Sequence, residues 1–478
     1  MNRREFLGLG AMVGANAVLG CSSMGKKNGG NVCSGGAPMI NFAAPAMKRI
    51  RVGVVGLGAR GAWAVNRLSM IPGVDVRAVC DVEQDRVDAK VKWAEANGKP
   101  TIKGFGGRED SWRNLCEYDG IDVVYNVTPW QLHAKVSVYA MECGKHTFIE
   151  VPAAMTLDEC WQLVETSEKT RLHCMQLENG CYREVGLAAH NMIRAGIFGE
   201  LTHGEAGYIH DLTEYNWNGY WKAWRLEWNR LHRGDQYPTH DLGPIARAMD
   251  ITRGDYFDYL VSLDSPQASF ELWAKEHLPE GDMRRNIKVA MGDMTTTLIK
   301  TMTGKSIMLQ HDVSTPRPRV ATFMAQGPGG HISIAPGKTE ITLRDFNHKG
   351  AYHHEPLDQA RTNAELKKYA HPLWKKAGEI AKLGGGHGGI DFMMDLVWAY
   401  CLQNGLPLDQ DVYELASWCA VCELSERSVR SGSMPQKFPD FTRGAWKTTA
   451  PRPFMDLDFN RIDIKDKKIG KDGTEMKV

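Results

Sequence analysis

The segment from Ile50 to Gly61 constrains the fold of this chain more than any other feature. Residues Ile50 to Val55 form a mostly apolar, β-branched run, which is typical of a buried parallel strand. Three glycines follow at the spacing GxGxxG, namely Gly56, Gly58 and Gly61, and Ala62 to Met70 has the pattern of a helix. A strand, a glycine loop and a helix in this order predict a dinucleotide-binding Rossmann domain.

Each glycine has its own part in this prediction. Gly56 permits the tight turn, Gly58 lets the backbone approach a pyrophosphate, and Gly61 allows close packing of helix on strand. The N-terminus of the helix offers N–H groups and partial positive charge to the phosphates, and we interpret Arg60 as a further phosphate contact. The other interpretation is a glycine turn in an unrelated α/β fold.

A carboxylate follows the second apolar run at the place where such a domain binds the ribose. The run Val74 to Cys80 ends on Asp81, twenty residues after Gly61. A carboxylate there accepts hydrogen bonds from the adenosine ribose hydroxyls and repels a 2′-phosphate. The sequence therefore predicts NAD, rather than NADP, as the cofactor.

The rest of the chain divides into two further kinds of pattern. Strand and helix patterns alternate to Pro152, which predicts an N-terminal α/β domain with a doubly wound parallel sheet over residues 47–152. Its remaining elements are expected at Val87–Asn97, Ile121–Val127, Leu132–Cys143 and His146–Val151. Residues 153–434 predict an α+β domain with an open, mainly antiparallel sheet, and 435–478 a C-terminal tail that packs on both domains.

Within the second domain, strands are expected at Thr202–Ile209, Val261–Phe270, Ile287–Met291, Thr295–Met302, Ser306–Asp312 and Arg319–Ala325. Helices are expected at Leu157–Lys169, Leu187–Ala195, Ala364–Leu383, Ile390–Gln403 and Asp411–Arg430. An open sheet face would favour a homodimer.

The first 46 residues predict an export signal and a linker. Arg3-Arg4 precedes an apolar, small-residue run to Gly20, which is typical of the Tat pathway; a short N-terminal helix is the alternative. Val18 to Cys21 also resembles a lipoprotein cleavage site, so both a lipid-anchored and a freely periplasmic protein remain open. Tat export moves folded proteins, which suits an enzyme that loads its cofactor before it leaves the cytoplasm.

The net charge and the cysteine content each argue against one class of protein. A formal net charge of +1 gives no reason to expect nucleic acid or an anionic membrane. Eleven cysteines in 478 residues are not a disulfide scaffold. Cys419 and Cys422 have redox or metal spacing, but the surrounding apolar pattern predicts a buried helix.

Polar residues of the second domain suggest proton chemistry without a metal. His203 and His210 face opposite sides of one expected strand, so they cannot bind one ion together. His240 follows Tyr237-Pro238-Thr239 in a polar loop and is interpreted as a general acid–base. Four tryptophans have helical spacing, which fits either a core stripe or a platform for sugars: Trp217, Trp221, Trp224 and Trp228.

Several segments resemble one family. Thr128-Pro129 with His133, followed by Glu150-Val151-Pro152, resembles the glucose–fructose oxidoreductase and inositol dehydrogenase superfamily, in which the middle residue of the second motif is a lysine that steers proton transfer. Valine cannot do so. The chain resembles glycoside hydrolase family 109 within that superfamily, in the segments Gly204–Leu212, Trp224–Leu226, Tyr237–His240, Pro316–Pro318 and Gly386–Gly389.

The resemblance implies an NAD-dependent α-N-acetylgalactosaminidase that uses oxidation, elimination, water addition and reduction instead of two carboxylates. Tightly bound NAD takes a hydride from the sugar C3, the C2 proton and the aglycone leave, and the hydride returns, so there is no net redox change. The alternatives are a sugar dehydrogenase with net NAD turnover and a non-catalytic NAD-bound sugar-binding protein.

The resemblance also implies site residues. The NAD contacts beyond the glycines are Ala59, Arg60, Asp81, Trp130, His133, Glu150, Val151 and Asn179. Tyr208, Arg225, Tyr237 and His240 would surround the sugar, and Arg319 stands where the family usually has a tyrosine. His240 is the expected base at the C3 hydroxyl, with Tyr237 beside it, and Tyr182 is expected at the C2 proton or water step.

Overall fold

The computed structural model describes residues 37–344, 355–452, 457–458, 467–469 and 475–477, which belong to one compact unit. The predicted export signal, with Arg3, Arg4 and Cys21, lies outside these residues. Within the described part of the chain, no helix is both long and apolar enough to cross a bilayer.

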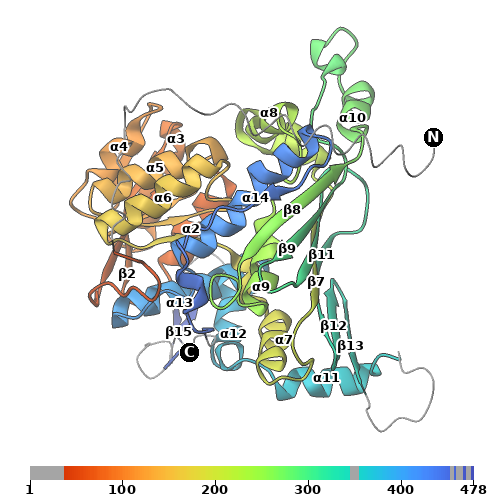
Figure 1. Ribbon diagram of the computed structural model, residues 1–478. Coiled ribbons are helices and arrows are strands. Elements are labelled where there is room, and N and C mark those ends of the chain that lie inside the picture. Colours follow the sequence, from red (N-terminus) through yellow and green to blue (C-terminus); the bar gives the residue numbers. More distant parts are fainter. Residues whose placement is uncertain (1–36, 345–354, 453–456, 459–466, 470–474, 478) are drawn as a thin grey trace, which may run out of the picture. The chain divides into compact units, whose positions relative to one another are not determined.

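The N-terminal sheet has six parallel strands in the order β3-β2-β1-β4-β5-β6 (Figure 1). The strands are β1 (Ile50–Val55), β2 (Val74–Asp81), β3 (Lys103–Gly106), β4 (Val123–Asn126), β5 (His146–Ile149) and β6 (Cys174–Gln176). The helices between them are α2 (Ala59–Leu68), α3 (Gln84–Ala96), α4 (Ser111–Cys116), α5 (Trp130–Glu142) and α6 (Leu157–Thr170). The order confirms the predicted Rossmann sheet.

Two differences from the sequence expectation concern this sheet. Strand β3 was not predicted, because Lys103 and Gly104 are exposed and the strand lacks the apolar pattern of its neighbours. The expected boundary at residue 152 falls between β5 and β6, yet β6 pairs with β5 in parallel. Helix α6 is the crossover between them, so the sheet extends to Gln176.

The second sheet has eight strands in the order β13-β12-β11-β7-β10-β9-β8-β14. Every neighbouring pair is antiparallel except β10 and β7. The strands are β7 (His203–Ile209), β8 (Phe257–Asp264), β9 (Thr295–Thr301), β10 (Ser306–Asp312), β11 (Val320–Gly327), β12 (Gly330–Ala335), β13 (Lys338–Leu343) and β14 (Gln436–Lys437). This confirms an open, mainly antiparallel sheet.

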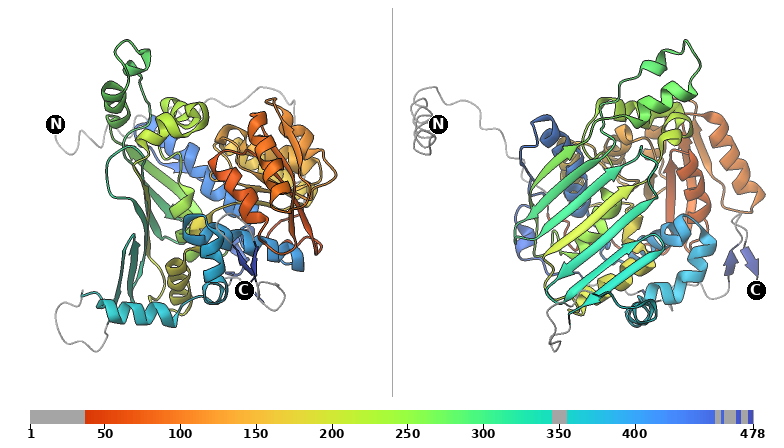
Figure 2. Two further views of the ribbon diagram at one scale, coloured as in Figure 1. Left: turned by 180° about the vertical axis from the view of Figure 1, so that it is seen from behind. Right: turned by 90° about the vertical axis from the view of Figure 1, so that its right-hand side faces the viewer.

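Helices cover one face of the second sheet and leave the other open. Helix α9 (Thr239–Ala248) packs on β7 and β11, and α14 (Val412–Arg430) packs on β8 and on α6. No helix of the described ranges lies across the other face in the right-hand view of Figure 2. Leu263 and Leu298 on this face are 58% and 52% exposed.

One C-terminal helix returns to the N-terminal sheet. Helix α13 (Ile390–Asn404) packs on α2 and β1. Its Asp395 accepts a hydrogen bond from the buried Arg67 at 2.6 Å, and its Trp398 stacks on Phe148 at 4.4 Å. Helices α13 and α14 therefore connect the two sheets through a shared hydrophobic core and not through a linker.

The tail after Pro435 also contacts the core. Strand β14 pairs with β8, and the Phe441 N–H donates to the Tyr256 hydroxyl at 3.1 Å. The Arg452 guanidinium donates to the Leu408 carbonyl at 2.5 Å.

Two strand expectations in the second domain were wrong. The run Val261–Phe270 is the end of β8 followed by helix α10 (Ser269–His277), because Pro266 lacks an N–H and the Asp293 carboxylate accepts from the first helical N–H groups. Segment Ile287–Met291 is not a strand. Its last N–H groups donate to carbonyls of helix α8 (Trp224–Leu231) instead of to a sheet.

Other elements were divided or missed. The single helix expected at Ala364–Leu383 is two helices, α11 (Gln359–Lys368) and α12 (Pro372–Gly384), because Pro372 cannot continue a helix and begins a new one. Strands β12 and β13 were not predicted. The remaining helix of this domain is α7 (Glu184–Arg194).

Candidate active site

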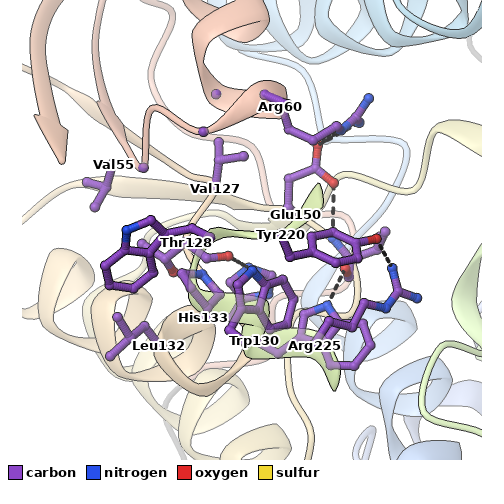
Figure 3. Close-up of a pocket in the computed structure, with 18 of the residues that line it drawn as sticks. Val55, Arg60, Val127, Thr128, Trp130, Leu132, His133, Glu150, Tyr220 and Arg225 are labelled. Carbon is purple, nitrogen blue, oxygen red and sulfur yellow. Dashed lines mark hydrogen bonds and ion pairs between the residues drawn. The ribbon is translucent and has the colours of Figure 1, made fainter. Parts of the chain in front are cut away.

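A single cavity of about 1110 Å³ brings together residues from both domains. It lies at the carboxyl ends of β1, β2, β4 and β5 and is completed by β7, α8 and α9. Every site residue predicted from the sequence lines it, apart from Tyr182. Figure 3 shows part of the wall, including Arg60, Trp130, His133, Glu150 and Arg225.

The glycine loop has the geometry that each glycine was predicted to allow. Gly56 has a φ of +93°, and a Cβ there would lie 2.5 Å from the Val127 carbonyl oxygen. A Cβ on Gly61 would lie 1.7 Å from the Gly56 oxygen. Gly58 has no heavy atom within 4 Å of a built Cβ, and no side chain caps helix α2 that begins after it. The loop therefore presents uncovered backbone to the cavity.

Asp81 is anchored to this loop. Its carboxylate accepts hydrogen bonds from the Leu57 N–H at 2.6 Å and the Glu83 N–H at 2.9 Å, and Arg86 lies 3.6 Å away. The carboxylate is buried at the end of β2 and faces the cavity. It is therefore placed where a ribose bound to the loop would meet it.

Arg60 is not a free phosphate ligand. Its guanidinium pairs with Glu150 at 2.6 Å and with Asp391 of α13 at 2.8 Å. Burial opposes its charge, but the two carboxylates outweigh burial and raise the pKa of Arg60 well above its ordinary value. Asn179 donates to the same Asp391. Arg60 therefore holds Glu150 in place, and phosphates are left to the backbone N–H groups.

His133 and Trp130 are fixed by backbone carbonyls. The two ring nitrogens of His133 each lie 2.7 Å from a carbonyl oxygen, those of Pro152 and Thr128, and burial lowers the pKa of His133. The Trp130 indole donates to the Val151 carbonyl at 3.2 Å. Both rings are thus rigid parts of the wall.

Tyr237 lies in a tight group of rings. Its ring stacks on Trp130 at 5.7 Å, meets Tyr208 edge-on at 5.0 Å, and has the Arg225 guanidinium 4.3 Å from its centre. Burial, followed by Tyr208, raises the pKa of Tyr237 well above its ordinary value. The phenol therefore keeps its proton at neutral pH.

His240 connects Tyr237 to a buried carboxylate that the sequence interpretation did not single out. Its Nε2 lies 3.0 Å from the Tyr237 hydroxyl, and its Nδ1 lies 2.9 Å from Glu178 Oε1. Glu178 is fully buried and lies two residues after the end of β6. Its only signal in the sequence was its place beside Asn179.

Tyr182 requires a correction. It does not line the cavity, it is 0% exposed, and its hydroxyl donates to Asp409 at 2.7 Å. Burial raises the pKa of Tyr182 well above its ordinary value. A phenol held in this way cannot reach a bound sugar, so Tyr182 supports the fold and is not a catalytic candidate.

The four tryptophans do not form one helical stripe. Lys222 and Ala223 have φ values of +49°, which break the helix between a short π-helical turn (Tyr215–Gly219) and α8. Trp217 is core and stacks on Trp273 at 5.1 Å. Trp221 and Trp224 line the cavity, and the Trp221 indole donates to Glu83 at 2.8 Å.

The cysteine pair predicted to lie in a helix is not part of the cavity wall. Cys419 and Cys422 are buried free thiols on α14, as the helix interpretation predicted, and burial raises the pKa of both. Among the described residues, no three histidine, cysteine or acidic side chains are grouped to hold a metal. Arg319 is exposed at the edge of the cavity.

Comparison with known proteins decides the family. Residues 182–448 match the profile described as the glycosyl hydrolase 109 C-terminal domain. A glycosyl hydrolase family 109 protein of Porphyromonas gingivalis is 43% identical over 423 residues, which is 86% of this chain and 89% of that one. The chain belongs to glycosyl hydrolase family 109. A relative from Shewanella oneidensis, named alpha-N-acetylgalactosaminidase, is 41% identical over 94% of this chain and 98% of its own.

The N-terminal domain of this family 109 member is an NAD-binding domain. Residues 50–177 match the profile of an oxidoreductase family with an NAD-binding Rossmann fold. The fold is shared with a levoglucosan dehydrogenase solved with NADH and levoglucosan, at a TM-score of 0.59 and 18% identity over 82% of this chain and 100% of that one. The open face of Gly58, the uncapped α2 and the buried Asp81 fit NAD as the cofactor.

Proposed function

We propose that this protein removes terminal α-linked N-acetylgalactosamine from glycans and keeps its NAD throughout the cycle. The observation that carries the proposal is the single cavity, in which the glycine loop and the Tyr237–His240 pair face one ligand space. The alpha-N-acetylgalactosaminidase from Shewanella oneidensis, similar over 94% of this chain, supports the choice of sugar.

NAD supplies a reversible oxidation at the sugar C3 hydroxyl, which acidifies the C2 proton and allows the aglycone to leave from C1. The chain's own residues handle the protons. Val151 is buried and apolar at the position of the dehydrogenase lysine, so it cannot take a proton. Tyr237 and His240 are the groups at hand, and the aromatic ring of Trp224 offers apolar contact to a sugar ring.

One assay separates this function from its rivals. The purified protein is incubated without added NAD with an aryl α-N-acetylgalactosaminide, and aryl β-N-acetylgalactosaminide and α-galactoside serve as controls. Aryl release without accumulation of NADH supports the hydrolase. Accumulation of NADH with added NAD⁺ would instead indicate a sugar dehydrogenase, and neither signal would indicate a sugar-binding protein. Solvent deuterium at C2 of the released sugar is the mark of elimination.

We further propose that the protein is exported by the Tat machinery to the periplasm or to a lipid anchor at Cys21. The twin arginines and the apolar run to Gly20 support this. Arg3→Lys combined with Arg4→Lys should retain the protein in the cytoplasm, as measured by cell fractionation. Cys21→Ser should abolish labelling by radioactive palmitate if the cysteine is lipidated. Unchanged labelling would contradict a lipid anchor at Cys21.

A second copy of the chain is the partner that we propose for the open sheet face. Val261, Leu298 and Met308 occupy one row across β8, β9 and β10, and Glu205 and Met324 continue it across β7 and β11. A largely apolar row on an uncovered face is typical of an interface between copies.

A further inference from the structure

Glu178 lies behind Tyr237 and His240, the two side chains that handle the protons in the proposed function. Three side chains lie in series: Glu178, His240 and Tyr237, joined at 2.9 and 3.0 Å. Of these, Tyr237 and His240 line the cavity, whereas Glu178 does not and is fully buried. The series thus runs from the ligand space into the protein interior.

The backbone around Glu178 is built for this contact. The Gly180 N–H donates to the same Oε1 at 2.8 Å. A Cβ on Gly180 would lie 2.4 Å from the His240 carbonyl oxygen, and a Cβ on Gly243 would lie 2.9 Å from the Glu178 Cγ. Two glycines therefore leave the space in which the carboxylate reaches the imidazole.

The contacts also decide which tautomer His240 adopts. A carboxylate only accepts hydrogen bonds, so the proton of neutral His240 resides on Nδ1 and is donated to Glu178. Nε2 is then an acceptor, and the Tyr237 hydroxyl donates to it. Because both ring nitrogens of His240 have protein partners, neither nitrogen is free to bind a sugar hydroxyl. Tyr237 is the member of the series whose hydroxyl oxygen can still accept a proton from the ligand.

We propose that Glu178 is the positioning residue of a proton relay, in which Tyr237 contacts the substrate and His240 acts through it. The substrate hydroxyl gives its proton to the Tyr237 oxygen while the Tyr237 proton moves to His240 Nε2. Two O–H bonds break, one at the sugar and the original one at Tyr237, while a new O–H bond forms at Tyr237 and an N–H bond forms at His240; the sugar oxygen keeps its electron pair. The resulting imidazolium lies against the Glu178 carboxylate, and the steps reverse when the proton returns. This changes the sequence-based expectation, in which His240 itself was the base at the sugar.

Charged and titratable groups among the described residues surround the relay. Those beside Tyr237 include Tyr208, Arg225, Glu150 and Tyr220, and the Asp235 carboxylate accepts from the Tyr237 N–H at 3.0 Å. His240 faces Tyr208 at 5.6 Å besides its two partners, and Glu178 lies near the thiols of Cys181 and Cys419. Arg225 favours negative charge on the Tyr237 oxygen, which assists the transfer.

Glu178→Gln tests the relay. The amide keeps the size of the side chain but can donate its N–H to His240 Nδ1, which moves the His240 proton to Nε2 and blocks the transfer from Tyr237. We expect kcat to fall on the order of 10²- to 10⁴-fold. KM should stay within about threefold, because the residues that line the cavity are unchanged. The solvent isotope effect on kcat should rise, and Glu178→Asp, which retains the charge, should recover part of the rate.

A matched control is Glu168→Gln. Like Glu178, Glu168 is a buried carboxylate outside the cavity wall, but its partners, the Tyr413 hydroxyl at 2.7 Å and Arg443 at 2.6 Å, do not line the cavity either. This variant should lose comparable stability and keep its kcat and isotope effect. Equal losses of kcat in both variants would reduce Glu178 to a structural role, and unchanged kcat in Glu178→Gln would overturn the relay.

A second measurement is independent of turnover. Nitrogen-15 chemical shifts of labelled histidine in the wild-type holoenzyme should show His240 protonated at Nδ1, and a proton at Nε2 would overturn the relay. If the wild type releases no aryl group, the proposed function fails, while the His240 tautomer still supports or refutes the arrangement.

Discussion

Replacing Gly58 by alanine should separate cofactor affinity from stability. Gly58 has a φ of −60° and a ψ of −169°, which alanine adopts without strain, and no protein atom lies within 4 Å of the new Cβ. The NAD-free variant should therefore be as stable as the wild type, or more stable by about 0.4–1 kcal/mol, because alanine has fewer unfolded conformations.

Cofactor affinity should move in the opposite direction. The methyl group projects into the cavity at the point where backbone N–H groups approach the pyrophosphate. Losing two charge-assisted hydrogen bonds at about 1.5 kcal/mol each amounts to about 3 kcal/mol. That corresponds to a Kd for NADH weaker by about 100-fold.

Gly61→Ala is the comparison within the same loop. Its Cβ would lie 1.7 Å from the Gly56 carbonyl oxygen, and backbone cannot move aside as a side-chain end can. This variant should lower the melting temperature even without NAD. Thermal unfolding and NADH fluorescence titration of NAD-stripped proteins provide both readings. A Gly58→Ala variant that binds NADH as tightly as the wild type, or that unfolds at the temperature of Gly61→Ala, would contradict this role of the glycine loop.

Three further predictions follow from contacts elsewhere. Trp221→Phe removes the indole hydrogen bond to Glu83 at the cavity and should release NADH about tenfold faster in stopped-flow fluorescence, for a loss of about 1.4 kcal/mol. Replacing the exposed Trp63 by phenylalanine should not change the release rate. Equal rates in the two variants would contradict a role of Trp221 in retaining NADH. Burial lowers the pKa of His146 to about 4 and that of His173 to about 3. The folded state keeps both imidazoles neutral, whereas the unfolded chain takes up protons on them below about pH 6.5. Their contribution to the free energy of unfolding is therefore complete above this pH and declines as the pH falls toward 4, by up to about 1.4 kcal/mol per pH unit for each group. Denaturant unfolding between pH 7 and 4 should show this slope, reduced in His173→Gln, and a flat profile would exclude it. Leu298→Lys on the open sheet face should convert a dimer to a monomer in light scattering with little loss of stability, whereas an intact dimer would place the interface elsewhere.

Sequence patterns were most reliable where neighbours along the chain decide the structure. The strand, the three glycines and Asp81 occupy one continuous stretch of backbone, so spacing and turn chemistry predicted their geometry. Patterns failed where a distant partner decides. Segment Ile287–Met291 is apolar and extended, but its N–H groups found α8 and not a strand. Strands β12 and β13 depend on pairing with β11 more than on their own composition.

The strand, the glycine loop and the family motifs were enough to predict the Rossmann domain, NAD as its cofactor and the family. The sequence also indicated which residues would lie together at the site, because the motifs of a family mark the residues that form its site. Only the tertiary structure decided how these residues are used. Arg60 meets Asp391 across 331 residues, and Glu178 meets His240 across 62. Tyr182 is only four residues after Glu178, yet its hydroxyl donates to Asp409, away from the cavity. The direction of a side chain depends on what packs around it, and spacing along the chain does not contain that information.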